Sequence, residues 1–196
     1  MRAARAQAMA ARFVFSLLVV VVVAGCSHAA LASSSVVEAT CTKATASGNR
    51  RDLAPFCVAA LQAAPGSGRA DARGLAVIAT NLTLANYTAA YATIKALQRR
   101  GGWSEREQAA LATCRQLYVE ALNVVHSAIH ALNASQTKAY VADMGVVQSA
   151  ATGCDDAFRG DRRRVGKSAA AESPLRKVDD DAINLTTIAT LIVIIL

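Results

Sequence analysis

The hydrophobic pattern is clearest between Ser104 and Leu132. Apolar side chains recur there at alternating steps of three and four residues: Leu111, Cys114, Tyr118, Ala121, Val125, Ile129 and Leu132. That spacing keeps them on one face of an α-helix and predicts an amphipathic helix with one buried face. Ser104 with Glu107 three residues later is typical of a capping box, so we expect the helix to start there.

The same period predicts three more long helices. One covers residues 70 to about 99 and ends at Gly101-Gly102, and another follows the turn Asn133-Ala134-Ser135. The last starts at Ser173-Pro174, where the serine fits an N-cap and the proline the first helical position. Their stripes contain Leu75, Ile78, Leu82, Tyr87, Tyr91, Ile94 and Leu97; Tyr140, Met144, Val147, Ala151, Cys154 and Phe158; and Val178, Ala182, Leu185, Ala189, Ile192 and Leu196. Four such helices with short links predict an up-and-down four-helix bundle over residues 70–196.

Two shorter helices are expected before the bundle, within residues 33–64. A polar turn over residues 47–51 separates them, and Pro65-Gly66 ends the second. Short helices are marginally stable alone, so a crosslink between these two matters. The predicted fold class is therefore all-α, with an N-terminal helical hairpin followed by a four-helix bundle in one domain over residues 33–196.

Residues 1–32 are typical of a secretory signal peptide. Arg2, Arg5 and Arg12 precede an apolar run from Phe13 to Val23, and Ala30-Leu31-Ala32 fits a cleavage site. The alternative is a bacterial lipoprotein signal that leaves a lipidated Cys26. We favour the eukaryotic interpretation because four glycosylation sequons follow downstream.

The charge of the mature chain is only mildly basic. The whole chain has 21 basic and 14 acidic residues, and removal of residues 1–32 takes away three arginines, which leaves +4. This weak excess does not predict a nucleic-acid partner. The signal also raises the mean hydropathy of +0.30, so that value does not predict a membrane protein.

Four cysteines remain in the mature chain: Cys41, Cys57, Cys114 and Cys154. An even number in a secreted chain predicts two disulfides, and the residues alone leave three pairings open. Cys114 and Cys154 lie on the core faces of two neighbouring antiparallel helices, which makes a bond between them geometrically reasonable.

The sequence contains no convincing catalytic, cofactor or metal site. His126 and His130 are spaced like two zinc ligands on a helix, but no third ligand is evident, so we interpret them as surface residues. Asp155-Asp156 is an acidic pair and residues 179–181 are an acidic run. Both lie near helix ends, where the helix dipole and solvent account for them. Arg162 to Arg164 are expected in a solvated connector, with a contact to acidic cell-wall polysaccharide as the alternative. An enzyme is not expected.

Four sequons are candidate glycosylation sites: Asn81, Asn86, Asn133 and Asn184. Asn133 is the best candidate because it lies in a predicted turn, and Asn184 is the weakest because it borders a core position. The apolar tail from Ile188 to Leu196 could belong to a lipid-anchor signal, but its periodicity continues the last helix, so we expect a core helix.

Several of these motifs together resemble the plant invertase inhibitor and pectin methylesterase inhibitor family over residues 34–196. They are Val37-x-x-x-Cys41, Phe56-Cys57-x-x-x-Leu61, Ala72-x-Gly-Leu-Ala-Val-Ile78, Cys114-x-x-x-Tyr118, the segment from Ser149 to Phe158, and Ser173-Pro174-Leu175. The resemblance implies the pairings Cys41–Cys57 and Cys114–Cys154. It also implies that the protein is no enzyme but an inhibitor that forms a complex with a carbohydrate-active enzyme and blocks its substrate cleft.

The resemblance leaves two targets, acid invertase and pectin methylesterase. Invertase inhibitors often carry a Pro-Lys-Phe motif where this chain has Thr137-Lys138-Ala139, so Lys138 is the candidate target-binding residue. A tryptophan typical of pectin methylesterase inhibitors is missing before Ser149, and we therefore favour invertase. The implied location is the apoplast or cell wall, with the vacuole as a further possibility. A helical cell-wall binding protein without inhibitory activity is the alternative of a different class.

Overall fold

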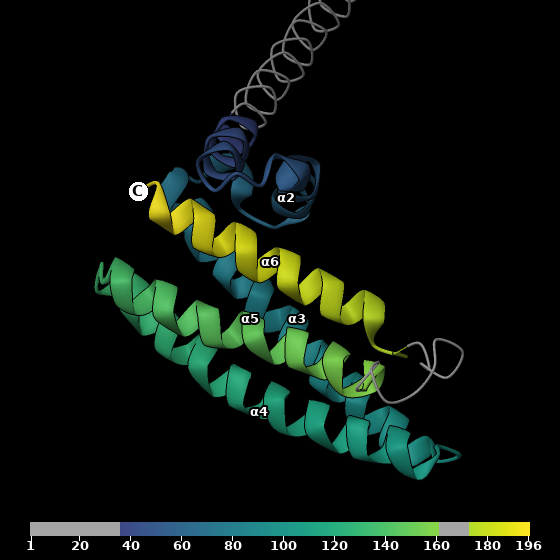
Figure 1. Cartoon of the computed structure of the whole chain (residues 1–196). Coiled ribbons are helices and arrows are strands. Elements are labelled where there is room, and N and C mark those ends of the chain that lie inside the picture. The colour runs from purple at the N-terminus through teal and green to yellow at the C-terminus, as the bar shows by residue number, and fades with distance from the viewer. Residues whose placement is uncertain (1–35, 161–172) are drawn as a thin grey trace, which may run out of the picture.

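The computed structural model describes residues 36–160 and 173–196 (Figure 1). A first helix covers residues 36–47. The following elements are η1 (Arg51–Leu53), α2 (Ala54–Ala63), η2 (Ser67–Arg69), α3 (Ala72–Arg100), α4 (Glu105–Asn133), α5 (Thr137–Arg159) and α6 (Arg176–Ile194). The predicted signal peptide, Cys26 and the run from Arg162 to Arg164 lie outside the described residues. In the part of the chain that the structure describes, no helix has the length and hydropathy needed to cross a membrane.

The four long helices form the predicted bundle. Helix α3 packs against α4 and α6, and α5 packs against α4 and α6, so that each long helix has two long neighbours. Figure 1 shows the short helices of the hairpin lying across one end of the bundle, beside the C-terminal end of α6. The all-α class, the bundle and the N-terminal hairpin are therefore confirmed.

The buried face of each long helix is the stripe that the period predicts. In α4, for example, Leu111, Tyr118 and Val125 are fully buried, and only Ile129 of the predicted set is partly exposed. The core has two parts. One joins the hairpin to the near half of the bundle, and the other fills the far half around Tyr87 and Tyr118.

Local capping explains where α3 and α4 begin. The Ser104 Oγ accepts the Glu107 N–H at 3.3 Å, and the Glu107 carboxylate accepts the Ser104 N–H at 2.9 Å, which completes the predicted capping box. At α3, the Asp71 carboxylate accepts the Gly74 N–H at 2.7 Å.

The predicted start of the last helix is wrong by two residues. Helix α6 begins at Arg176, and Leu175 occupies the N-cap position without a side-chain cap. The Ser173 Oγ instead accepts the Leu175 N–H at 3.1 Å, and the Ser173 carbonyl accepts the Arg176 N–H at 3.1 Å. Ser173 thus closes a turn that contains Pro174 before the helix starts, as serine hydroxyls commonly do.

The hairpin is fixed to the bundle of its own chain. The disulfide Cys41–Cys57 joins its two helices, with a Cα–Cα distance of 5.8 Å. Gly48 lies so close to Leu191 of α6 that a Cβ atom at residue 48 would clash with the leucine side chain. The Lys43 ammonium also donates to the Ile195 carbonyl at 3.4 Å, where α6 ends. These contacts hold the hairpin over the end of the bundle that contains the α4–α5 turn and the end of α6.

Candidate target-binding surface

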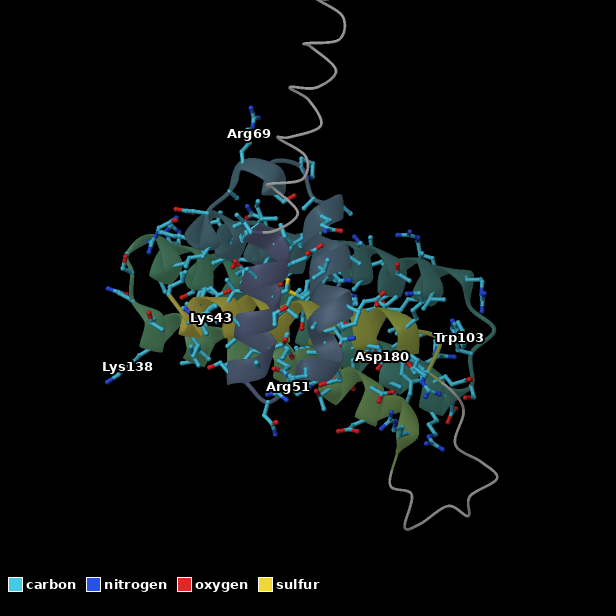
Figure 2. All side chains as sticks on the ribbon, turned by 90° about the horizontal axis from the view of Figure 1, so that it is seen from above. Lys43, Arg51, Arg69, Trp103, Lys138 and Asp180 are labelled. Carbon is cyan, nitrogen blue, oxygen red and sulfur yellow. A yellow bond between two sulfur atoms is a disulfide. The ribbon has the colours of Figure 1, made fainter. Side chains whose placement is uncertain are left out.

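Lys138 lies in the first turn of α5 and is exposed. It forms no ion pair with any described residue. Figure 2 shows its side chain projecting from one end of the bundle, while Trp103 lies at the opposite end. An unpaired ammonium at the tip of a rigid helix is available for a carboxylate of a partner protein.

The turn before Lys138 is held in one conformation. One terminal nitrogen of Arg73, Nη2, donates to the Leu132 carbonyl at 2.9 Å and to the Ser135 Oγ at 3.1 Å. The Gln136 N–H donates to the Ala131 carbonyl at 2.8 Å. Ser135 itself has a positive φ of 57°, a conformation that non-glycine residues adopt uncommonly. The turn therefore presents the start of α5 from a defined position.

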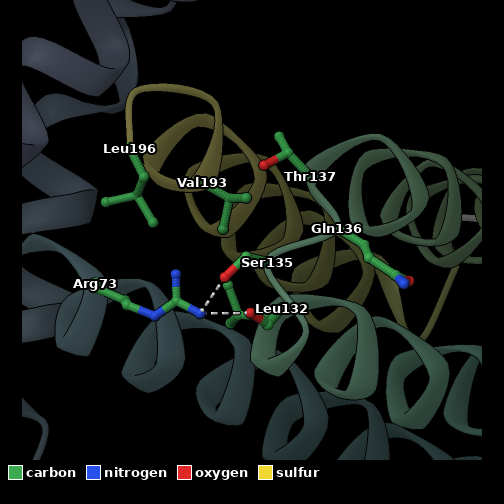
Figure 3. A pocket seen from close by; sticks show the side chains of 7 residues that line it. All are labelled: Arg73, Leu132, Ser135, Gln136, Thr137, Val193 and Leu196. Atoms are coloured by element: carbon green, nitrogen blue, oxygen red, sulfur yellow. Dashed lines mark hydrogen bonds between the residues drawn. The ribbon is translucent and has the colours of Figure 1, made fainter.

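A small cavity of about 210 Å³ opens beside this turn (Figure 3). Segments far apart in the sequence line it: the start of α3, the α4–α5 turn and the end of α6. Its lining residues are Arg73, Leu132, Ser135, Gln136, Thr137, Val193 and Leu196. The cavity therefore combines one cation and several polar groups with apolar walls, and no carboxylate side chain lines it.

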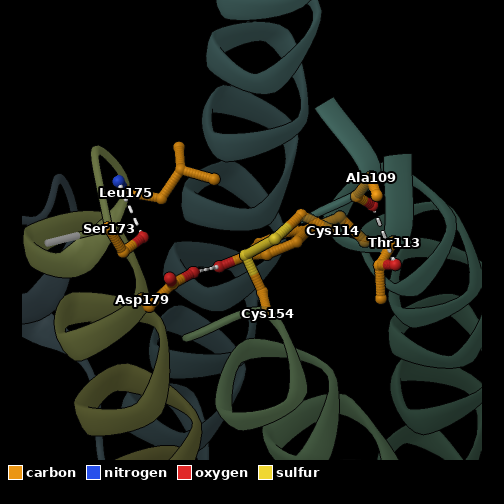
Figure 4. Close-up of a disulfide and its surroundings, with 8 residues drawn as sticks. Ala109, Thr113, Cys114, Cys154, Ser173, Leu175 and Asp179 are labelled. Carbon is orange, nitrogen blue, oxygen red and sulfur yellow. Dashed lines mark hydrogen bonds between the residues drawn. A yellow bond between two sulfur atoms is a disulfide. The ribbon is translucent and has the colours of Figure 1, made fainter. Parts of the chain in front are cut away.

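The second disulfide joins α4 to α5 in the far half of the bundle. Cys114 and Cys154 are fully buried and their Cα atoms lie 4.6 Å apart (Figure 4). The bond connects the long helix that ends at the α4–α5 turn to the helix that starts after it. It restricts the angle between these two helices and so supports the position of Lys138.

A buried acid next to this disulfide was missed by sequence reasoning. Asp179 is only 1% exposed, and its Oδ1 accepts the Tyr118 hydroxyl at 2.5 Å, while its Oδ2 has no partner among the described residues. Burial raises the pKa of Asp179 to about 7, the Tyr118 hydrogen bond opposes that rise, and the nearby Asp155 and Asp180 add to it. The expectation of a solvated run over residues 179–181 is therefore wrong for its first member.

The hydroxyls of the buried Tyr87 and Tyr140 are satisfied and connect helices. Tyr87 donates to the Val147 carbonyl at 2.7 Å, and the Tyr140 and Thr80 hydroxyls share a hydrogen bond of 2.8 Å. Burial raises the pKa of Tyr87 and of Tyr140 to about 12. The Tyr87 and Tyr118 rings also pack against each other with centroids 5.1 Å apart. These groups lie in the core, which indicates that they stabilise the bundle.

The family model described as "Plant invertase/pectin methylesterase inhibitor" matches residues 35–192, most of the chain. The chain belongs to this family. Among solved structures, it is similar to a mutant form A of a pectin methylesterase inhibitor from Arabidopsis, with a TM-score of 0.60 and 19% identity over 73% of this chain and 89% of the other. A pectin methylesterase inhibitor from Arabidopsis thaliana matches with a TM-score of 0.55 and 20% identity, over 73% and 88% of the two chains. A search of curated proteins finds no significant match.

The solved structures share the fold of this inhibitor-family chain, and at these identities they do not name its target. Both disulfides join the cysteines that the family resemblance pairs. The family is one of inhibitors of invertase or pectin methylesterase, which implies a protein–protein complex. The surface around Lys138 is therefore considered as a candidate docking surface.

The two candidate histidines and the other acids of the runs at 155–156 and 179–181 in this inhibitor-family chain lie on the surface or pair locally. His126 and His130 are exposed on α4, and the described residues include no group of three or more His, Cys, Asp or Glu arranged to hold a metal. Asp155 forms an ion pair with Arg159 at 2.5 Å. Asp181 pairs with Lys177 at 2.9 Å, and Asp180 is exposed.

The four sequons of this inhibitor-family chain differ in accessibility. At Asn133 both the asparagine and Ser135 are exposed, and the site lies beside the cavity. The threonines of the Asn81 and Asn184 sequons, Thr83 and Thr186, are buried and donate to carbonyls of their own helices. Asn86 is partly buried, with an unpartnered Oδ1.

Proposed function

We propose that this protein inhibits acid invertase by inserting the end of the bundle that carries Lys138 into the substrate cleft of the enzyme. One observation carries the proposal. Within a chain of the inhibitor family, Lys138 is an exposed cation without an ion pair to any described residue, and it lies at the start of a helix whose position a disulfide and the α4–α5 turn both restrict.

The chemistry of the expected target supports a lysine at this position. Glycosidases of this kind typically use a pair of carboxyl groups that flank the scissile bond. An ammonium that enters such a cleft pairs with one carboxylate and occupies the place of the substrate. Charge complementarity of this kind also speeds the encounter of the two proteins.

Pectin methylesterase is the second candidate target. The residues on either side of Lys138 are Thr137 and Ala139, so the apolar anchor and the rigidity of a Pro-Lys-Phe motif are missing. This observation weakens the case for invertase. The similar solved structures are pectin methylesterase inhibitors, which supports the shared fold and keeps this second target open.

We further propose that residues 33–196 form the mature protein after removal of a signal peptide over residues 1–32. The protein would then act in the apoplast or cell wall, or in the vacuole. It would bind neither nucleic acid nor membrane, and it would need no cofactor or metal. If neither enzyme is inhibited, the alternative is a helical cell-wall protein without inhibitory activity.

The test is a paired inhibition assay. Oxidised protein of residues 33–196 is titrated into an acid invertase and into a pectin methylesterase at mildly acidic pH. We expect loss of invertase activity, and about tenfold weaker inhibition by Lys138→Ala, as for removal of one charge from a contact between proteins. The matched control is Lys95→Ala, which removes an exposed lysine from the far half of α3.

The outcomes of this assay separate the candidates. Inhibition of pectin methylesterase alone would replace the first target by the second. Unchanged inhibition by Lys138→Ala would remove Lys138 from the contact. Inhibition of neither enzyme, with helical circular dichroism intact, would favour the non-inhibitory alternative.

A further inference from the structure

We propose that the cavity at Arg73 is a second docking site, and that it receives the side chain of an aspartate or glutamate from the target enzyme. The inference rests on the proposed function, because it assigns a contact within the same inhibitory complex. It adds to Lys138 a second cation, the exposed Arg73, which lies on a different helix.

The guanidinium of Arg73 is only partly used by the protein itself. Its Nη2 donates to Leu132 and Ser135, whereas Nε and Nη1 form no hydrogen bond with any described residue. A guanidinium has five N–H groups, so three remain for a ligand. Figure 3 shows the unbonded terminal nitrogen turned away from Leu132 and toward the side of the cavity formed by Val193 and Leu196.

The charge around this cavity favours an acidic occupant. None of its lining residues is an aspartate or a glutamate. The carboxylate closest to Arg73 in sequence is Asp71, which already accepts the Gly74 N–H as the N-cap of α3. Lys138 follows the lining residue Thr137 in the sequence, so a second cation lies on the same end of the bundle. A carboxylate that enters the cavity therefore meets the Arg73 guanidinium and no acidic side chain in the wall.

The size and the walls of the cavity fit a single amino-acid side chain better than a sugar. Its volume of about 210 Å³ is below the ~300–1,000 Å³ of sites that take small molecules. Val193 is buried and Leu196 is half-exposed, and together they offer apolar surface to the methylene groups of an acidic side chain. The carboxylate would then accept a charge-assisted hydrogen bond from Nη1 or Nε, because both N–H groups of Nη2 are already used within the protein.

The existing bonds of Arg73 prepare it for this role. Because Nη2 is anchored to two groups of the α4–α5 turn, the side chain is already restricted before a partner arrives. Restriction before binding lowers the entropy lost in the complex. The same bonds mean that Arg73 also stabilises the turn, and an experiment must separate this role from docking.

The test uses two kinds of variant in the inhibition assay. Arg73→Gln removes the cation, and Thr137→Phe fills the cavity while Arg73 stays in place. We expect each to weaken inhibition about tenfold, and we expect Arg73→Gln also to reduce the dependence of inhibition on salt. The matched controls are Arg69→Gln, an exposed arginine of η2, and Ala142→Phe, an exposed position of α5, and both should stay within about twofold.

Several results would overturn the inference. Wild-type inhibition by Arg73→Gln excludes the contact. Weaker inhibition by Arg73→Gln together with unchanged inhibition by Thr137→Phe shows that Arg73 acts only through the turn. If Arg73→Gln does not fold, the inhibition by Thr137→Phe alone tests the inference, and unchanged inhibition by that variant would overturn it.

A second measurement does not depend on the target. N-acetyl-aspartate amide is titrated into the ¹⁵N-labelled protein, and the Arg73 Nε–H resonance is followed by NMR, with N-acetyl-asparagine amide as the neutral control. A shift with the acid alone supports the carboxylate site even if neither enzyme is inhibited, in which case only the proposed function fails. Equal or absent shifts with the two probes in a protein that inhibits neither enzyme overturn the inference.

Discussion

Replacement of Asp179 by asparagine should change how the stability of this protein depends on pH. The folded protein buries the carboxyl group against Tyr118 of α4, with Asp155 of α5 and Tyr87 of α3 also acting on this site. Asp180, on the same helix, lies exposed beside it. The pKa of Asp179 rises from its ordinary value of 3.8 to about 7, mainly because burial disfavours the charged form.

The sign of the effect follows from proton binding in the two states. Between the unfolded pKa of 3.8 and the folded pKa of about 7, the unfolded chain has released this proton and the folded chain still holds it. The free energy of unfolding therefore falls as pH rises through this window. Below pH 3.8 Asp179 is protonated in both the folded and the unfolded protein, and above about pH 7 it is ionised in both. The decrease in the free energy of unfolding is therefore complete above about pH 7.

The size of the effect comes from the same two values. A difference of about three pH units at ~1.4 kcal/mol per unit gives roughly 4 kcal/mol of stability lost between pH 4 and pH 7. Asparagine cannot ionise and still accepts the Tyr118 hydroxyl through its Oδ1. Asp179→Asn should therefore lack this loss, and it should become more stable than the wild type as the pH approaches neutrality.

The assay is urea unfolding followed by circular dichroism from about pH 4 to about pH 7.5. Asp52 and Glu107 have lowered pKa values through bonds to Arg50 and Ser104. Their contributions are common to both proteins, so they cancel when the variant is compared with the wild type. Asp156→Asn is the matched control, because this acid of α5 is exposed and is not among the groups that raise the pKa of Asp179, so the difference between pH 4 and pH 7 should stay unchanged.

Parallel pH profiles for the wild type and Asp179→Asn would refute the reasoning. They would mean that Asp179 is already ionised in the folded protein at acid pH. In that case the environment would have to supply the unpaired Oδ2 with a donor, and the pKa would not be raised.

Two further predictions concern the disulfides and Asn133. Loss of the Cys114–Cys154 bond in a double alanine variant should lower the free energy of unfolding in urea by about 4 kcal/mol, and loss of Cys41–Cys57 should lower it by about 3 kcal/mol. The difference is expected because Cys114–Cys154 closes the longer loop. A larger effect for loss of Cys41–Cys57 would contradict this explanation. For protein secreted from plant cells, mass spectrometry should find a glycan at Asn133. The Asn133→Gln variant should then inhibit more strongly than the glycosylated protein, because the glycan lies beside the Arg73 cavity. An unmodified Asn133 would refute both the glycan and its effect on inhibition.

The sequence predicts the secondary structure well because its signals are local. The Ser104 capping box and the apolar stripes each depend on residues within a few positions, and the structure places the four long helices where these signals indicate. The start of α6 was misassigned for a local reason too. A serine before a proline fits an N-cap and also fits a turn closed by the serine hydroxyl, and the second arrangement occurs.

The candidate site could be predicted only in part, because it depends on contacts between distant segments. Lys138 is a candidate from a family motif and stays a prediction. The cavity combines Arg73 and Leu196 with the α4–α5 turn, and only the packing of the bundle brings these together. Asp179 was missed because a run of three acids suggests a solvated surface. A helical register would have helped, since residue 179 lies three positions before the buried Ala182 and seven before the buried Thr186.

The two ends of the molecule should respond to pH through different groups, and this makes stability and inhibition separable. In the far half of the bundle, Asp179 is neutral at mildly acidic pH, and the core is then at its most stable. At the docking end, the proposed contacts Arg73 and Lys138 contain no carboxyl or imidazole group. We therefore expect a change in inhibition between pH 4 and pH 7 to arise from acidic groups of the target or from loss of folded inhibitor. Asp179→Asn removes the loss of folded inhibitor that comes from ionisation of Asp179. The pH profile of inhibition by this variant therefore reports the titration of the enzyme's own acidic groups.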